Sequence, residues 1–305
     1  MTRAVVFAYH DVGVRCLSVL LDAGVEVALV VTHQDSAGET IWFDSVAELS
    51  KRNNLPCITP DDPNTEQIVK QISTLQPDFL FSFYYRMMLK APLLSIPKQG
   101  ALNIHGSLLP HYRGRVPVNW AIIHGEKQTG ASLHYMTEKP DAGNLVGQTA
   151  VPILRDDLAI DVFHKVACAA EVTLHQALPA LMAGHAPSTP LDLKQGSYFG
   201  GRRAEDGLIN WSASAMDIHN LIRAVAPPYP GAFTTLLKKP LKVLRSRLID
   251  NLPHANAVFF CDNDACYAQC GGGGTLQLLE LEWDGQLLSP KDFQNLTNGQ
   301  IVALT

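Results

Sequence analysis

Runs of consecutive apolar residues alternate with helically spaced apolar residues along the N-terminal part of the chain. The former pattern predicts buried strands and the latter predicts helices. The predicted strands are Arg3–Tyr9, Val25–Thr32, Leu55–Ile58 and Pro77–Phe83. The predicted helices between them are Gly13–Ala23, Ser45–Asn53 and Asn64–Leu75. Strands that alternate with helices are typical of an α/β fold with a mostly parallel sheet and right-handed crossovers.

The pattern changes further along the chain. It predicts a strand over Ala131–Met136 and a long helix over Ala159–Ala183, followed by a segment rich in Gly, Pro and Ser. From about Asp206 onward, one helix (Ala213–Val225) precedes several short strand-like runs. We therefore predict an α/β domain over 1–190, a linker over 191–204, and a small β-rich, open-barrel-like domain over 205–305.

Two turns that contain glycine, one near the N-terminus and one near residue 272, lack the motifs of nucleotide-binding loops. Ligands of open α/β sheets usually bind beyond the carboxyl ends of the strands. The first such turn reads AYHDVGV and lacks the glycines of GxGxxG, so we predict a Rossmann-like domain that does not bind NAD. No Lys-Ser/Thr pair follows Gly271–Gly274, so this stretch is predicted to be a plain hairpin turn.

The composition narrows the class of protein. Of 305 residues, 47% are hydrophobic, which allows a sizeable core. The net charge of −5 argues against a large nucleic-acid-binding surface. The N-terminal apolar run is too short for a signal peptide, and no stretch reaches membrane-spanning length. We expect a cytoplasmic protein without membrane insertion.

The cysteines do not predict a metal site. Cys261, Cys266 and Cys270 are spaced poorly for zinc, and the chain contains no CxxC pair. Free thiols in a reducing compartment are the preferred interpretation. We therefore expect no metal cofactor.

Three polar residues are candidates for acyl-transfer chemistry. Asn103 and His105 lie two positions apart in a short apolar run, and Asp141 follows in a Lys-Pro-Asp-Ala-Gly segment. An amide can stabilise an oxyanion, an imidazole can move a proton, and a carboxylate can orient that imidazole and raise its pKa. Without a paired nucleophile, this set favours direct transfer to a bound amine. Ser107 is the rival nucleophile, although it lacks a GxSxG elbow.

Two longer blocks carry a family resemblance. NIHGSLLPHYRGRVPVNWAI and TGASLHYMTEKPDAGNLVGQ resemble the folate-dependent formyltransferases, and INWSASAMDIHNLIRAVAPPYPGAF resembles the start of that family's C-terminal domain. The resemblance implies that Asn103, His105 and Asp141 are catalytic and that 10-formyltetrahydrofolate is the formyl donor. It also implies a set of folate-contacting residues, namely Met87, Met88, Leu89, Arg115, Thr137, Glu138, Lys139, Pro140 and Asp141.

The acceptor is predicted from other segments. FAYHDVG, THQDSAGETIWFDSVAEL and SFYYR resemble formyltransferases that act on UDP-4-amino-4-deoxy-L-arabinose in bacterial lipid A modification, a pathway linked to polymyxin resistance. There the domain is the N-terminal half of a bifunctional enzyme; the sequence leaves open whether this chain stands alone. Its oligomeric state, including a homo-oligomer, is also left open.

Other acceptors remain as alternatives. They are another nucleotide-linked amino sugar, methionyl-tRNA, and water in a formyl-folate hydrolase; a non-catalytic binding module is a further rival. The tRNA alternative is disfavoured because Asp35, Glu39 and Asp44 occupy the place of a basic insertion. From residue 201 onward, moreover, the sequence contains nine Lys and Arg residues and ten Asp and Glu residues, whereas a domain that binds tRNA should be basic.

Overall fold

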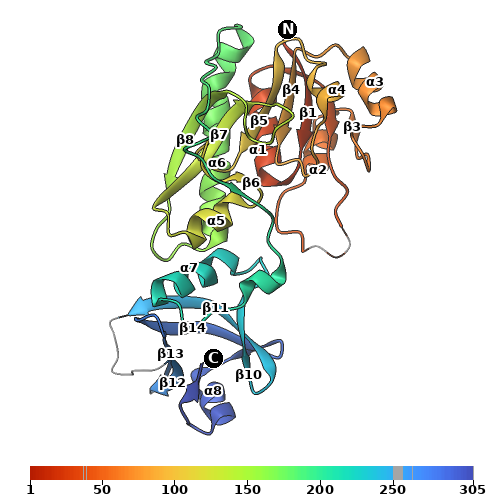
Figure 1. Cartoon of the computed structure of the whole chain (residues 1–305). Coiled ribbons are helices and arrows are strands. Elements are labelled where there is room, and N and C mark those ends of the chain that lie inside the picture. Colours follow the sequence, from red (N-terminus) through yellow and green to blue (C-terminus); the bar gives the residue numbers. More distant parts are fainter. Residues whose placement is uncertain (37, 39, 250–256, 263, 305) are drawn as a thin grey trace. The chain divides into compact units, whose positions relative to one another are not determined.

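The computed structural model describes residues 1–36, 38, 40–249, 257–262 and 264–304 (Figure 1). The chain forms two compact units. The first comprises Met1–Pro117, Gln128–Pro152 and Phe163–Gly200. The second comprises Val118–Lys127, Ile153–Val162 and the described part of Gly201–Thr305. Each unit is therefore assembled from segments that are separated in sequence.

The first unit is built on a mostly parallel sheet. Its strand order is β3-β2-β1-β4-β5-β7-β8. The strands are β1 (Arg3–Ala8), β2 (Glu26–Val31), β3 (Cys57–Ile58), β4 (Phe79–Phe83), β5 (Gly100–His105), β7 (Gln128–Tyr135) and β8 (Leu145–Pro152). The first five strands in this order pair in parallel, whereas β7 pairs antiparallel with both β5 and β8. This arrangement confirms the predicted fold class.

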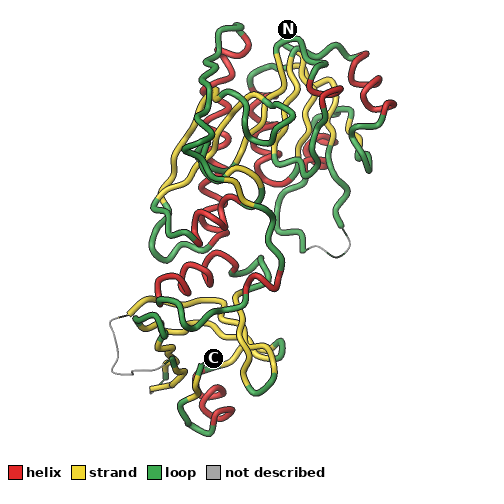
Figure 2. The backbone as a smooth tube through the Cα atoms, in the orientation of Figure 1, coloured by secondary structure: helices red, strands yellow, loops and turns green. Residues whose placement is uncertain are grey.

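Helices connect the parallel strands, and the first three of them are the helices that the sequence predicts. Figure 2 shows them as red coils beside the yellow strands. The connecting helices are α1 (His10–Asp22), α2 (Val46–Arg52), α3 (Glu66–Thr74) and α4 (Ala91–Leu94). Two further helices, α5 (Pro117–Ile123) and α6 (Ala159–Met182), each contain residues of both units. The Ser45 side chain caps α2 by accepting a hydrogen bond from the Glu48 N–H, which satisfies a backbone donor. Among the described residues, no helix is long and apolar enough to cross a membrane.

The central strands form the core of this unit. Every residue of β4 is buried, and Val5, Phe7 and Leu80 pack in one apolar cluster with residues of β2, β5, α3 and α4. Fully burying one such side chain contributes about 1.5–3 kcal/mol relative to leaving it exposed. Continuous apolar strands are the pattern expected where both faces of a parallel sheet are covered.

A ligand-binding edge follows from the strand order. The order reverses between β1 and β4, and ligands of open α/β sheets bind at such a point beyond the carboxyl ends of the strands. β5 lies beside β4 in the same direction and ends at His105. The predicted catalytic histidine therefore lies at this edge.

A short parallel ribbon forms beside the sheet. β6 (Arg113–Gly114) pairs with β9 (Tyr198–Phe199), which lies within the predicted linker 191–204. The N–H groups of Arg113 and Arg115 donate to the carbonyls of Ser197 and Phe199, each over 3.0 Å. Part of that segment is thus tied to the first unit.

The second unit contains a curled antiparallel sheet, which confirms the predicted β-rich, open-barrel-like domain (Figure 1). Its strand order is β10-β11-β14-β13-β12-β16, and β15 pairs with β14. The elements are α7 (Ala215–Val225), β10 (Ala232–Leu236), β11 (Lys239–Ile249), β12 (Val258–Asp262), β13 (Ala265–Gln269), β14 (Thr275–Trp283), β15 (Gln286–Leu288), α8 (Pro290–Thr297) and β16 (Val302–Ala303). Gly271–Gly274 joins β13 to β14 as the predicted hairpin turn.

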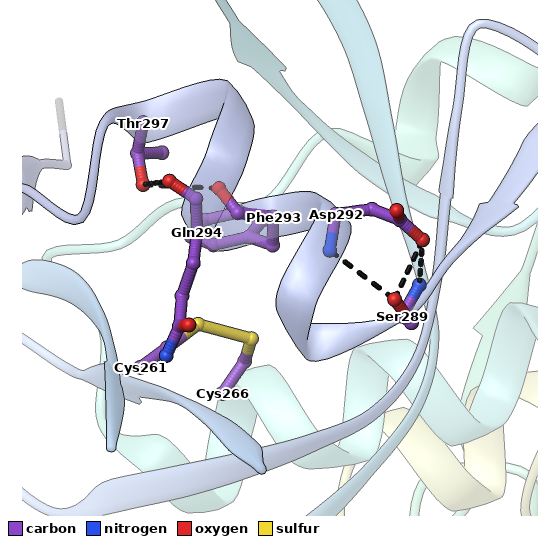
Figure 3. The surroundings of a disulfide bond; sticks show 7 residues. All are labelled: Cys261, Cys266, Ser289, Asp292, Phe293, Gln294 and Thr297. Atoms are coloured by element: carbon purple, nitrogen blue, oxygen red, sulfur yellow. Dashed lines mark hydrogen bonds between the residues drawn. A yellow bond between two sulfur atoms is a disulfide. The ribbon is translucent and has the colours of Figure 1, made fainter. Parts of the chain in front are cut away.

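One prediction about the cysteines is wrong. Cys261 and Cys266, expected to be free thiols, form a disulfide (Figure 3). Cys261 on β12 lies directly opposite Cys266 on β13 in the antiparallel register, which brings their Cα atoms to 4.2 Å. Cross-strand partners at this separation meet side chain to side chain. Cys270 is a buried free thiol.

Candidate active site

Strand pairing brings a second histidine next to the predicted pair. Asn103 and His105 are two residues apart on β5, so their side chains leave the same face of the sheet. In the antiparallel β5–β7 pair, Asn103 lies opposite His134. Residues directly opposite each other share a face, and His134 therefore joins the predicted set.

Asp141 is positioned by a tight loop between β7 and β8. The Tyr135 N–H donates to the Asn144 carbonyl across the mouth of this loop over 2.9 Å. A Cβ on Gly143 would lie 1.9 Å from the Tyr135 carbonyl oxygen, so only glycine allows the chain to turn back here. Asp141 itself adopts a left-handed backbone conformation (φ +48°). The loop thus holds the carboxylate in one place.

The Asp141 carboxylate faces both His105 and His134, and His134 in turn contacts Asn103. Asp141 Oδ1 lies 3.6 Å from His105 Nδ1 and 3.6 Å from His134 Nε2. Asp141 Oδ2 accepts a 2.8 Å hydrogen bond from the Gly114 N–H. On the other side of its ring, His105 Nε2 lies 2.8 Å from the Tyr112 carbonyl oxygen. Both ring nitrogens of His105 therefore face acceptors, an arrangement that stabilises the ring when it takes up a proton.

His134 orients the amide of Asn103. Its Nδ1 lies 2.8 Å from the Tyr135 carbonyl oxygen, which can only accept, so in the neutral ring Nδ1 carries the proton. Its Nε2 then accepts from Asn103 Nδ2 over 3.1 Å. His134 was not among the residues predicted from the sequence; the available signal was its position near the end of the predicted strand Ala131–Met136, inside a block that carries the family resemblance.

Burial sets the charges of this site. Burial raises the pKa of Asp141, but the neighbouring His105 ring and the Gly114 N–H stabilise the carboxylate and lower its pKa to about 2. For His105, burial lowers the pKa below its ordinary value of 6.5 and outweighs the opposite effect of Asp141. The expectation of a raised His105 pKa is therefore wrong. At neutral pH the pair is a carboxylate beside a neutral imidazole.

The predicted folate loop follows β4 and contains both a buried residue and exposed ones. Leu89 is 2% exposed and belongs to the apolar core. Met87 and Met88 are 38% and 52% exposed. Asn64 anchors the loop, because its amide donates to the Met88 carbonyl and accepts from the Lys90 N–H. Leu89 thus fixes the loop while the two methionines face outward.

The remaining predicted contacts lie on the loop that contains Asp141 and directly after β6. Thr137, Glu138 and Lys139 are exposed and Pro140 is partly buried, on the loop that ends in Asp141. Thr137 Oγ1 donates to the Lys139 carbonyl over 2.9 Å. Arg115 is exposed directly after β6. These residues are thus close in sequence to Asp141 or to Gly114, which contacts it, and their contact with a folate stays a prediction.

The rival nucleophile is engaged in holding its own loop. Ser107 is fully buried, and its hydroxyl donates to the His111 carbonyl over 2.6 Å. Its carbonyl oxygen accepts from the hydroxyl of Ser132. A hydroxyl in this environment favours a structural role. Across residues 1–304, leaving aside 37, 39, 250–256 and 263, no cluster of three His, Cys, Asp or Glu side chains could hold a metal ion.

Several solved structures share this fold. An N-formyltransferase from Helicobacter canadensis, solved with folinic acid and dTDP-3-aminofucose, is 20% identical, with a TM-score of 0.69 over 91% of this chain and 99% of its own. The sugar 3N-formyltransferase WlaRD, solved with dTDP and 5-N-formyl-THF, is 20% identical, with a TM-score of 0.71 over 94% and 99%. A sugar N-formyltransferase from a Shewanella species is also 20% identical, with a TM-score of 0.65 over 82% and 99%.

Two family models match the chain itself. The model described as formyl transferase matches residues 11–178, and the model described as the formyl transferase C-terminal domain matches residues 202–298. The first match contains the whole set of Asn103, His105, His134 and Asp141. The matches together span most of both units, and the chain therefore belongs to the formyl transferase family.

Proposed function

We propose that this enzyme transfers a formyl group from 10-formyltetrahydrofolate to the amine of a nucleotide-linked amino sugar. The observation that carries the proposal is the convergence of Asn103, His105 and Asp141 at the carboxyl edge of the sheet. The solved N-formyltransferases that share the fold support both substrate classes, since one holds folinic acid with dTDP-3-aminofucose and another holds 5-N-formyl-THF with dTDP.

Asn103 is proposed to stabilise the tetrahedral intermediate. When the amine attacks the formyl carbon, a C–N bond forms and the carbonyl oxygen becomes an oxyanion. One Asn103 Nδ2–H is directed at His134, and no described residue is bonded to the other. That second N–H is available to the oxyanion, a type of donor whose loss typically costs about a hundredfold to a thousandfold in rate.

His105 is proposed to move the proton. Its neutral ring takes a proton from the attacking nitrogen and passes it to N10 of the folate as the C–N10 bond breaks. Asp141, held ionised, stabilises the imidazolium that exists between the two transfers. Transfer is direct, and no covalent intermediate forms on the protein.

The folate is proposed to lie between two loops. Met87 and Met88 would contact the pterin over the core residue Leu89, and Arg115 would contact another part of the donor. The residues from the other side are Thr137, Glu138, Lys139, Pro140 and Asp141. Exposed apolar side chains beside backbone polar groups suit a flat, heteroatom-rich ring.

The acceptor is proposed to be UDP-4-amino-4-deoxy-L-arabinose, which would place the enzyme in lipid A modification. The resemblance of FAYHDVG, THQDSAGETIWFDSVAEL and SFYYR to enzymes acting on that sugar supports it. The acidic balance from residue 201 onward disfavours the alternative acceptor, methionyl-tRNA.

Product analysis tests this proposal. The enzyme is incubated with 10-formyltetrahydrofolate and UDP-4-amino-4-deoxy-L-arabinose, and the sugar nucleotide should gain the mass of one formyl group. Parallel reactions contain dTDP-3-aminofucose, charged initiator tRNA, or no acceptor. Formylation of dTDP-3-aminofucose alone would change the sugar but keep the class. Formylation of the tRNA alone, or donor hydrolysis alone, would contradict the proposal.

Replacing His134 by alanine is expected to lower kcat by about tenfold or more, with little change in the KM for the folate. The reason is that Asn103 loses the acceptor that orients its amide. The variant His134→Gln, whose side-chain oxygen can accept the same bond, should recover part of the rate. Steady-state kinetics check this; equal rates for wild type and His134→Ala would remove His134 from its positioning role.

A further inference from the structure

Arg113 is a buried arginine for which the described part of the chain supplies no counter-ion. The residue lies on β6 and is only 8% exposed. Its Nε is buried and has no hydrogen-bond partner, and no described residue forms an ion pair with the guanidinium. Arginine is rarely this buried unless it is paired, because removing a charge from water is costly. An unsatisfied buried group of this kind requires an explanation.

The backbone on both sides of Arg113 contacts the catalytic residues. The preceding residue, Tyr112, places its carbonyl 2.8 Å from His105 Nε2, and the following residue, Gly114, donates its N–H to Asp141 over 2.8 Å. The opposite edge of β6 is bonded to β9. Arg113 therefore lies between two residues that contact the catalytic set, in a segment fixed by hydrogen bonds on both sides.

The immediate surroundings do not neutralise this charge. Asp141 is directed at Gly114 and the two histidines, and it forms no ion pair with Arg113. The ring of Tyr198, the partner of Arg113 in the ribbon, lies 6.0 Å from the guanidinium carbon, at the outer limit of a cation–π contact. An anionic ligand would supply the counter-charge, and a guanidinium fork matches the oxygens of a phosphate.

We infer that Arg113 binds a phosphate of the acceptor, a nucleoside diphosphate sugar; this inference rests on the proposed function. In such an acceptor one sugar ring separates the diphosphate from the amine that meets His105. In the folate, a whole p-aminobenzoyl group separates N10 from the glutamate carboxylates. The phosphate is thus the anion that reaches an arginine next to the catalytic set. Arg115, two residues further on and exposed, keeps its proposed contact with the folate.

Binding measurements with separate probes test this assignment. Isothermal titration calorimetry is performed with UDP, with uridine as the phosphate-free probe, and with folinic acid as the folate probe. Arg113→Gln is expected to weaken UDP binding by roughly 10- to 100-fold, the usual range for a lost charge-assisted hydrogen bond. Binding of folinic acid should stay within about twofold of wild type. Arg113→Lys, which keeps the charge but loses the fork, should fall between the two.

Arg52→Gln is the matched control. Arg52 is an exposed arginine of the same unit at the C-terminal end of α2, which leads away from the carboxyl edge of the sheet. It should leave both affinities unchanged. A parallel loss of UDP affinity in Arg52→Gln would show a general charge effect and would overturn the assignment.

Each remaining outcome decides the inference. Unchanged UDP binding in Arg113→Gln overturns it, and so does weakened folinic acid binding alone, which would assign Arg113 to the donor. If Arg113→Gln and Arg113→Lys both fail to fold, Arg113 is structural and the inference is also overturned. The product assay fails or succeeds independently, because UDP binding requires no turnover. If UDP binds in an Arg113-dependent way but no acceptor is formylated, the proposed reaction is contradicted and the assignment of Arg113 is not.

Discussion

Replacing His105 by alanine is expected to lower kcat by about a thousandfold, within the usual range for a lost general acid–base group. The imidazole is the group placed to carry the proton between the attacking amine and the folate nitrogen. Folinic acid binding should stay within about twofold, because the proposed pterin contacts come from Met87 and Met88 on another loop. Single-turnover kinetics and calorimetry measure the two effects separately.

The control for this variant is a histidine away from the site. His175 is exposed on α6, and His175→Ala should keep the wild-type rate. The melting temperature of both variants shows whether the fold is intact. Undiminished turnover in a folded His105→Ala protein would remove His105 from the mechanism, whereas a joint loss of folinic acid binding would indicate a collapsed site.

Replacing Asp141 by asparagine is expected to lower kcat by about a hundredfold to a thousandfold and to change the pH profile. Asparagine keeps an oxygen that can accept from the Gly114 N–H, so the loop is retained and mainly the charge is lost. Without the carboxylate, the imidazolium of His105 is less stable. The pKa of His105 should therefore fall further below 6.5.

The direction of the pH effect follows from the role of His105 as the first proton acceptor. The ring must be neutral, and it becomes protonated as the pH falls through its pKa, so the acid limb of kcat/KM reports that pKa. In the wild type this limb should lie below pH 6.5, and in Asp141→Asn it should lie lower still. Asp141 itself, with a pKa of about 2, adds no limb in the usual range.

An exposed aspartate provides the matched control. Asp22, at the C-terminal end of α1, is exposed. Asp22→Asn should leave both the rate and the acid limb where the wild type has them. An Asp141→Asn variant with a reduced rate but an unmoved acid limb would contradict the coupling between the carboxylate and His105, and would leave Asp141 as a loop-positioning residue only.

Much of the α/β framework could be predicted because its signals are local. The runs VVFA, VEVALVVT and FLFSF are apolar at nearly every position, and each becomes a strand buried in the sheet. The intervening helices follow from spacing within one turn. Their ends shift by a few residues, as for α1, which begins at His10 rather than Gly13. These shifts reflect where the preceding strand ends, which apolar spacing does not encode.

The C-terminal sheet was predictable as a class but not in its pairings. Short strand-like runs indicate a β-rich unit, yet they do not say which strand lies beside which. The Cys261–Cys266 disulfide depends on the register of β12 against β13 and was missed for that reason. The β6–β9 ribbon joins segments more than eighty residues apart, and it too is a long-range pairing.

The primary structure alone determined which residue types serve formyl transfer. The amide, the imidazole and the carboxylate can be recognised from the sequence blocks that contain them and from their spacing. Their mutual arrangement was decided by the tertiary structure. Antiparallel pairing of β5 with β7 set His134 opposite Asn103, and the turn at Gly143 brought Asp141 between both rings. The tertiary structure also reversed the expected pKa shift of His105, because the loss of water around a ring depends on everything that packs against it, and no local pattern of residues specifies that.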